Sequence, residues 1–159
     1  MTVPLAARST VMGSDSLMSS FVLHPQLSRD CVHVGDLPLS RLLLLNDSRY
    51  PWLVLVPRRA DVTELFELGP GDRSMLLDET CQAGERLLHL CGGDKLNVGA
   101  LGNLVPQLHV HVVARSAGDP AWPGPVWGHS AARPYDEQTL SDRLALLRGD
   151  LAGAGLDEP

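Results

Sequence analysis

The chain has 159 residues, which is enough for one domain with a hydrophobic core, whereas dividing it would leave two marginal halves. Hydrophobic residues make up 44% and charged residues 20%, a composition typical of a folded globular protein. The formal net charge of -6 argues against nucleic acid or anionic membranes as partners, but it is compatible with a small pocket that binds one phosphate.

The N-terminus carries neither strand nor helix periodicity, and residues 1–18 are expected to form a mobile segment. It lacks the apolar run of a signal peptide, and no segment reaches the roughly 20 apolar residues of a membrane span, so a cytoplasmic protein is expected. The remaining chain is predicted to form a domain over residues 19–130, followed by a C-terminal helix and tail over 131–159. The cysteines Cys31, Cys81 and Cys91 lack CxxC spacing and are interpreted as small core residues.

Three strands are predicted first in the chain. The segment CVHVGDLPLSRLLLLND (31–47) has apolar runs on both sides of Gly35-Asp36, which predicts a hairpin that turns at this pair. The segment YPWLVLVPRR (50–59) is a third apolar run, bounded by Pro51 and Pro57, and it predicts a central strand.

A long amphipathic helix is predicted next, over residues 68–95. Pro70 suits its first turn and Gly92 its end. Its expected buried face follows spacings of four and three, through Leu77, Cys81, Gly84, Leu88 and Cys91. Two further strands, KLNVGAL (95–101) and PQLHVHVVAR (106–115), and a final helix over 136–153 complete the pattern. This order predicts an α+β domain, with a largely antiparallel sheet of about five strands, one long packed helix and a C-terminal helix.

The last predicted strand carries polar side chains on one face. In an extended chain side chains alternate, so Gln107, His109 and His111 should share one face and the intervening apolar residues the other. Residues on one face are roughly 7 Å apart, so both imidazoles could reach one phosphate group.

Three interpretations of this strand remain open from the residues alone. The two histidines could be zinc ligands, although no third ligand stands at a recognisable spacing. They could be structural residues. They could also perform phosphorus chemistry, in which a neutral imidazole attacks while its neighbour donates to the phosphoryl oxygens.

The segment QLHVHVV resembles the motif of the histidine triad (HIT) superfamily of nucleotide hydrolases and transferases, His-φ-His-φ-His-φ-φ with φ apolar. Gln107 stands in place of the first histidine. The resemblance extends over roughly residues 20–128 and includes the paired strands before 59 and the Trp122-Pro123 pair after the motif. Leu104 stands where many members carry a serine or threonine near the leaving group.

The resemblance implies a role for each matching residue. His109 would attack the α-phosphorus of a nucleotide and form a nucleotidyl-histidine, while His111 would stabilise the phosphoryl oxygens and Gln107 would position groups without transferring protons. The expected substrate-binding residues are Asp47, which would meet the ribose, its neighbour Asn46, and the phosphate-side residues Asn97, Gly102 and Asn103.

The resemblance also implies a homodimer that binds a small nucleotide and needs no cofactor or metal. The expected activity is hydrolysis or transfer of nucleoside monophosphate from dinucleoside polyphosphates or nucleoside phosphoramidates. The alternatives are a nucleotide-binding module with little or no turnover, because of Gln107 and Leu104, and a metal-binding strand.

Overall fold

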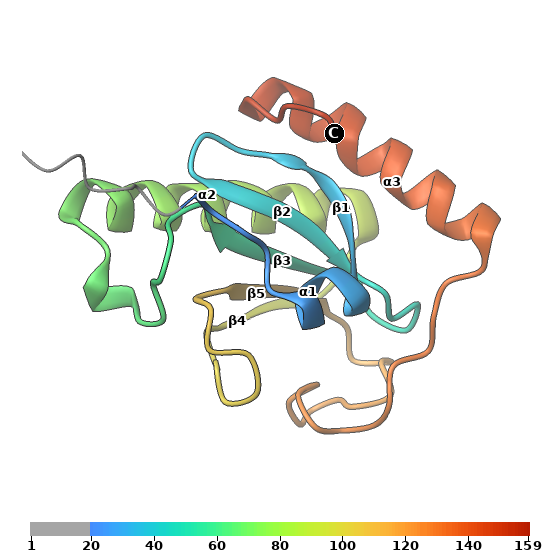
Figure 1. Ribbon diagram of the computed structural model, residues 1–159. Helices are drawn as coiled ribbons and strands as arrows, with labels where there is room; N and C mark the ends of the chain where they lie inside the picture. Colours follow the sequence, from blue (N-terminus) through green and yellow to red (C-terminus); the bar gives the residue numbers. More distant parts are fainter. Residues whose placement is uncertain (1–19) are drawn as a thin grey trace, which may run out of the picture.

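The computed structural model describes residues 20–159, so the segment expected to be mobile lies outside the described residues. Its helices are α1 (Pro25–Asp30), α2 (Pro70–Cys91) and α3 (Glu137–Leu151), with short 3-10 turns at Leu65–Glu67 and Ala152–Ala154. Its strands are β1 (Cys31–Asp36), β2 (Ser40–Leu45), β3 (Trp52–Pro57), β4 (Lys95–Gly99) and β5 (Val110–Arg115). They form one five-stranded antiparallel sheet in the order β1-β2-β3-β5-β4, which confirms the predicted α+β architecture (Figure 1).

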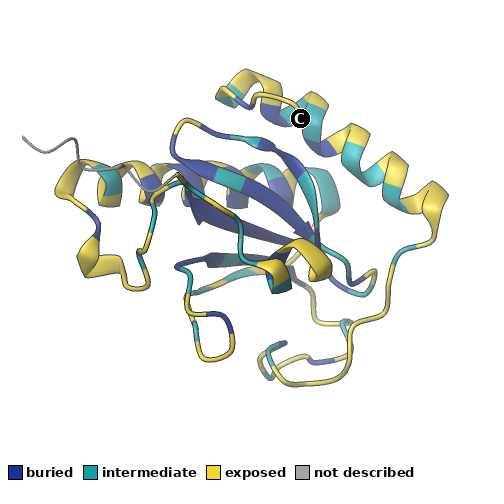
Figure 2. Ribbon diagram, viewed as in Figure 1, coloured by how far each residue is buried: buried dark blue, intermediate teal, exposed yellow. Residues whose placement is uncertain are grey.

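The two faces of the sheet carry separate hydrophobic cores. The larger core packs one face against α2 and α3, and it includes Leu76, Leu87, Leu147 and Leu151 from the helices. The smaller core lies on the opposite face, where α1 contributes Leu27 and the chain after β5 contributes Val126 (Figures 1 and 2). The face covered by α2 and α3 is therefore packed in the larger core. The face with α1 is less fully covered and could hold a binding site.

The first hairpin forms as predicted, but its turn lies after the Gly35-Asp36 pair. Both residues belong to β1, and the turn closes where Leu37 N donates to Ser40 O at 2.8 Å. Gly35 is needed for another reason: a Cβ there would lie 2.6 Å from Asp157 O, so the C-terminal tail could not approach β1. The glycine reflects close packing of the chain rather than a turn.

The long helix is confirmed, but its buried face is not the predicted one. Leu77 and Cys81 are exposed, and of the predicted stripe only Gly84 is fully buried. The observed buried face instead consists of Leu76, Glu79, Thr80, Ala83, Gly84 and Leu87. A hydrophobicity pattern does not identify this face because the face includes the charged residue Glu79. The Glu79 carboxylate is buried because its oxygens accept the main-chain N–H groups of Leu39 at 2.6 Å and Ser40 at 3.1 Å.

The cysteines do not behave alike, contrary to the expectation that all three are core residues. Cys31 is buried, Cys91 is half-buried and Cys81 is exposed on α2, and all three are free thiols. Within residues 20–159 no helix is long and apolar enough to cross a membrane.

The last strand, β5, is shorter than predicted, so it contains His111 while His109 directly precedes it. It begins at Val110 rather than Pro106, and just before it Leu108 N donates to Val62 O at 2.9 Å. Leu108, Val110 and Val112 nevertheless pack in the larger core, so the predicted alternation holds from residue 108 onward. His109 and His111 consequently face the side of the sheet where α1 lies.

Candidate active site

A pocket of about 970 Å³ opens on the α1 face of the sheet. Figure 1 shows α1, the yellow loop between β4 and β5 and the orange segment before α3 all on this side. Six of the predicted site residues line it, namely Asn46, Asp47, Gly102, Asn103, His109 and His111. The two others, Gln107 and Asn97, are not among its lining residues.

His109 is held with a free nitrogen available for chemistry. The side chain is buried, and its Nδ1 lies 2.7 Å from the main-chain oxygen of Gln107. A carbonyl oxygen only accepts hydrogen bonds, so Nδ1 must carry the proton. In the neutral ring Nε2 then keeps its lone pair, which is the state that a nucleophilic imidazole requires.

His111 is held in the opposite tautomer. The indole N–H of Trp52 donates to His111 Nδ1 at 3.0 Å, and an indole N–H can only donate, so the proton of the neutral ring resides on Nε2. Burial, with a smaller contribution from His109, lowers the pKa of His111 to about 4. The two imidazole centroids are 4.8 Å apart. A nitrogen acceptor and a nitrogen donor therefore lie side by side in the pocket.

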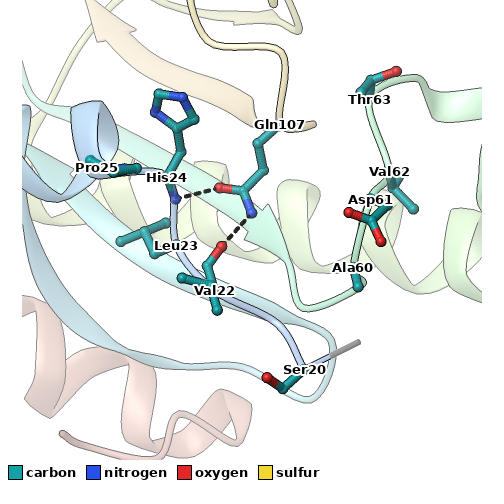
Figure 3. Close-up of a pocket in the computed structure, with 10 residues that line it drawn as sticks. All are labelled: Ser20, Val22, Leu23, His24, Pro25, Ala60, Asp61, Val62, Thr63 and Gln107. Carbon is teal, nitrogen blue, oxygen red and sulfur yellow. Dashed lines mark hydrogen bonds between the residues drawn. The ribbon is translucent and has the colours of Figure 1, made fainter. Parts of the chain in front are cut away.

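The Gln107 side chain is engaged by the segment before α1. Its Oε1 accepts the main-chain N–H of His24 at 2.8 Å, and its Nε2 donates to Val22 O at 2.9 Å (Figure 3). Gln107 precedes β5 and lines a second, smaller cavity of about 390 Å³, which Asp61 and Thr63 also line. The Gln107 amide therefore links the segment before β5 to the segment before α1.

Asp47 and Asn46 hold one end of the pocket in place. Arg49 donates to both oxygens of the buried Asp47 carboxylate, with Nε 2.9 Å from Oδ1 and Nη2 2.6 Å from Oδ2. Burial alone would raise the pKa of Asp47, but the hydrogen bonds from Arg49 hold it below its ordinary value. Arg49 also donates to Ala131 O, and Asn46 Oδ1 accepts Tyr135 N at 3.0 Å. The turn after β2 thereby fixes the segment that closes the pocket.

Of the predicted phosphate-side residues, Asn97 lies outside the pocket lining, whereas Gly102 and Asn103 in the β4–β5 loop line the pocket. Asn97 Oδ1 accepts from Arg115 Nη1 at 2.7 Å, so this amide supports a buried guanidinium that also pairs with Asp119. Gly102, with a φ of 70°, and Asn103 bring the loop back to the pocket wall. Of the two tryptophans after the motif, Trp127 lines the pocket and Trp122 stacks over Arg115.

Three residues that shape this site, Trp52, His24 and Arg49, are not among the predicted site residues. Trp52 lies in a segment that was predicted only as a central strand, and it is buried, but it also sets the tautomer of His111. His24 and Arg49 were not assigned to the site, although His24 lines the pocket and Arg49 anchors Asp47. Among residues 20–159 no group of three or more His, Cys, Asp or Glu side chains could hold a metal ion.

Comparisons with known proteins find one matching family model and several similar solved structures. A family model described as the HIT domain matches residues 26–118. A histidine triad protein from Sinorhizobium meliloti is 48% identical, with coverage of 84% of this chain and 99% of its own and a TM-score of 0.81. Histidine triad proteins from Marinobacter aquaeolei (44% identity, 85% and 98% coverage, TM-score 0.83) and Bradyrhizobium japonicum (44%, 82% and 98%, 0.80) are similarly close. No functionally curated protein matches the sequence.

Proposed function

Because the chain belongs to the histidine triad (HIT) superfamily of nucleotide-binding hydrolases and transferases, we propose that it cleaves nucleotides at the α-phosphorus through a covalent intermediate on His109. The observation that carries this proposal is the pair of opposite tautomers. Nε2 of His109 is free to attack, and Nε2–H of His111 is placed to donate to a phosphoryl oxygen.

The reaction has two steps. Nε2 of His109 forms a bond to the α-phosphorus, the bond from phosphorus to the leaving group breaks, and its electron pair departs with that group. Water then attacks the same phosphorus and releases one proton to the solvent, and the N–P bond breaks with its electron pair returning to Nε2 of His109. Nucleoside monophosphate leaves, and the His109 ring is neutral again. His111 and the main chain at Gly102 and Asn103 would stabilise the charge that develops on the non-bridging oxygens in both steps.

The remaining pocket suits a nucleoside. Its apolar lining residues include Leu27, Leu45, Val54, Leu101, Leu104, Val105, Val126 and the aromatic Trp52 and Trp127. Such a surface favours a flat, apolar base, with polar groups at its edge for the sugar. Asp47, at the pocket end near the β2–β3 turn, is the residue proposed to accept the ribose hydroxyls.

Asp47→Asn should raise KM for ribonucleotides by on the order of 10- to 100-fold, because a charged acceptor of hydrogen bonds contributes about 1.5 to 3 kcal/mol. The effect should be much smaller for 2′,3′-dideoxy substrates, which lack the hydroxyls. Arg49→Ala is the matched control, since it loosens the same turn but keeps the carboxylate, and it should affect both substrate sets alike. An equal effect of Asp47→Asn on the two sets would assign Asp47 to the turn alone.

The proposed activity itself is tested with a panel of dinucleoside polyphosphates and nucleoside phosphoramidates. Turnover, together with a nucleotidyl adduct seen by intact-mass spectrometry of the quenched protein, is the expected result. Tight nucleotide binding without turnover or adduct would instead establish a binding module. Activity that is lost with a chelator and restored by zinc would contradict the metal-free mechanism.

We further propose that the chain forms a homodimer through the β4 side of the sheet. β4 is an edge strand, and apolar side chains are exposed on it and on the following loop, at Val98, Leu101 and Leu104. Sedimentation of the protein should give twice the mass of the chain. Val98→Glu should yield monomers, whereas Leu77→Glu, on the exposed face of α2, should not. A wild-type monomer at micromolar concentration would contradict this.

A further inference from the structure

His24 stands at the junction of the two cavities described above, since it lines both of them. Gln107 connects it to His109: the main-chain oxygen of Gln107 accepts from the His109 ring, and its side chain accepts the main-chain N–H of His24. Figure 3 shows the His24 ring extending away from these main-chain bonds. One residue therefore fixes the candidate nucleophile and a second pocket histidine.

The pairing of the strands orders the groups along the pocket. Trp52, which begins β3 just after the Asp47 turn, pairs with Val113, and Val54 pairs with His111. Moving back along the chain from His111 to His109 and then to Gln107 therefore leads away from that turn. α1 lies parallel to this line. Its last residue, Asp30, is beside the turn, where the main-chain oxygen of Asp30 accepts from Asn46 N at 2.9 Å, and His24 precedes its first residue at the far end.

His24 thus lies at the end of the pocket opposite Asp47. With the ribose at Asp47 and the α-phosphorus at His109, the group that departs from phosphorus points toward His24. The smaller cavity, which His24 also lines, offers space for the distal half of a substrate.

The tautomer of His24 is fixed by α1. The main-chain N–H of Gln26 donates to His24 Nδ1 at 3.1 Å, which caps the helix, and a main-chain N–H can only donate. The proton of the neutral ring is therefore on Nε2, so the free nitrogen of His24 is a hydrogen-bond donor.

We propose that His24 is a catalytic residue that donates a hydrogen bond from Nε2 to the leaving-group oxygen, so that the protein prefers leaving groups that depart as phosphate anions. This inference rests on the proposed function. When the P–O bond breaks, its electron pair remains on the leaving oxygen, which stays unprotonated and is stabilised by the donor. An amine leaving group would need a proton. Nδ1 of His24 and Nδ1 of His111 each accept a hydrogen bond and so carry no proton, and these rings could give up the Nε2 proton only by becoming imidazolate anions. Dinucleoside polyphosphates are therefore the favoured substrates, and phosphoramidates the poorer ones.

His24→Asn tests this, because asparagine is a good helix cap but removes the imidazole. The probes are aryl esters of adenosine 5′-monophosphate whose phenols span a range of pKa, together with a dinucleoside tetraphosphate. A donor matters most where most charge collects on the leaving oxygen, so kcat/KM should fall by on the order of 100-fold for the least acidic phenols and little for the most acidic. The tetraphosphate expels a weakly basic polyphosphate, so it should behave like the acidic phenols. A plot of log kcat/KM against phenol pKa should be steeper for the variant.

His89→Asn is the control, since His89 is exposed on α2 across the sheet, and it should reproduce the wild-type slope. A uniform loss across the series in His24→Asn, or a wild-type preference for phosphoramidates, would overturn the role of His24 while leaving the histidine mechanism intact. Failure of the proposed function is distinguishable, because the wild type would then turn over none of the esters and form no adduct.

Discussion

Replacing His109 by alanine is expected to lower kcat by at least about 10⁴-fold while nucleotide affinity is largely kept, because the lost group attacks phosphorus and no other side chain replaces it. The adduct seen by intact-mass spectrometry should vanish in parallel. His109 contributes one hydrogen bond to the fold, to the Gln107 oxygen, so a large loss of stability is not expected. Retained turnover would refute the covalent mechanism.

His109→Asn distinguishes nucleophilic attack by the His109 ring from the structural effect of its hydrogen bond to the Gln107 oxygen. The asparagine amide can donate to the Gln107 oxygen as the imidazole does, but it cannot attack phosphorus. It should therefore be as inactive as the alanine variant and melt closer to the wild type. Recovery of activity in His109→Asn would mean that the ring only holds the chain before β5 in place.

The centre of the sheet could be predicted from the sequence because β2 and β3 contain continuous apolar runs, of which β3 is bounded by prolines. The helix α2 could be located but not oriented, since two stripes one residue apart have nearly the same spacing. The stripe through Leu76 and Ala83 includes the carboxylate of Glu79, which is buried because it accepts two main-chain N–H groups from the β1–β2 turn. Hydrophobic periodicity contains no information about such a partner 40 residues away.

The histidine pair could be predicted for a local reason, namely that alternation along an extended chain places His109 and His111 on one face. The residues that orient the two histidines and fix their tautomers could not be predicted, because the contacts that these residues make join distant segments of the chain. Trp52 is 59 residues from His111, and the His24 N–H is 83 residues from the Gln107 side chain that accepts it. For the same reason the sequence gives no hint that the amides of Gln107 and Asn97 are occupied by other parts of the protein.

His111→Ala is expected to weaken stabilisation of the transition state by about 2.7 to 4 kcal/mol, the cost of removing one preorganised donor to a developing oxyanion. The loss should appear mainly in kcat, because the oxygens carry most charge in the transition state. Trp52→Phe is the graded control: it keeps the imidazole and an aromatic ring but removes the N–H that holds the proton on Nε2. It should lose less activity than His111→Ala, and an unchanged rate in both variants would make His111 structural.

The pH dependence of stability gives His111 an independent test. Its folded-state pKa of about 4 lies below the ordinary value of about 6.5, so between these values the unfolded chain binds more protons than the folded protein. The free energy of unfolding should therefore fall as the pH drops from about 6.5 to about 4, and this part of the slope should disappear in His111→Ala. Denaturant titrations across this range measure it. Parallel curves for the two proteins would show that His111 is not held neutral by burial and by its neighbour His109, and the donor role assigned to its Nε2–H would lose its basis.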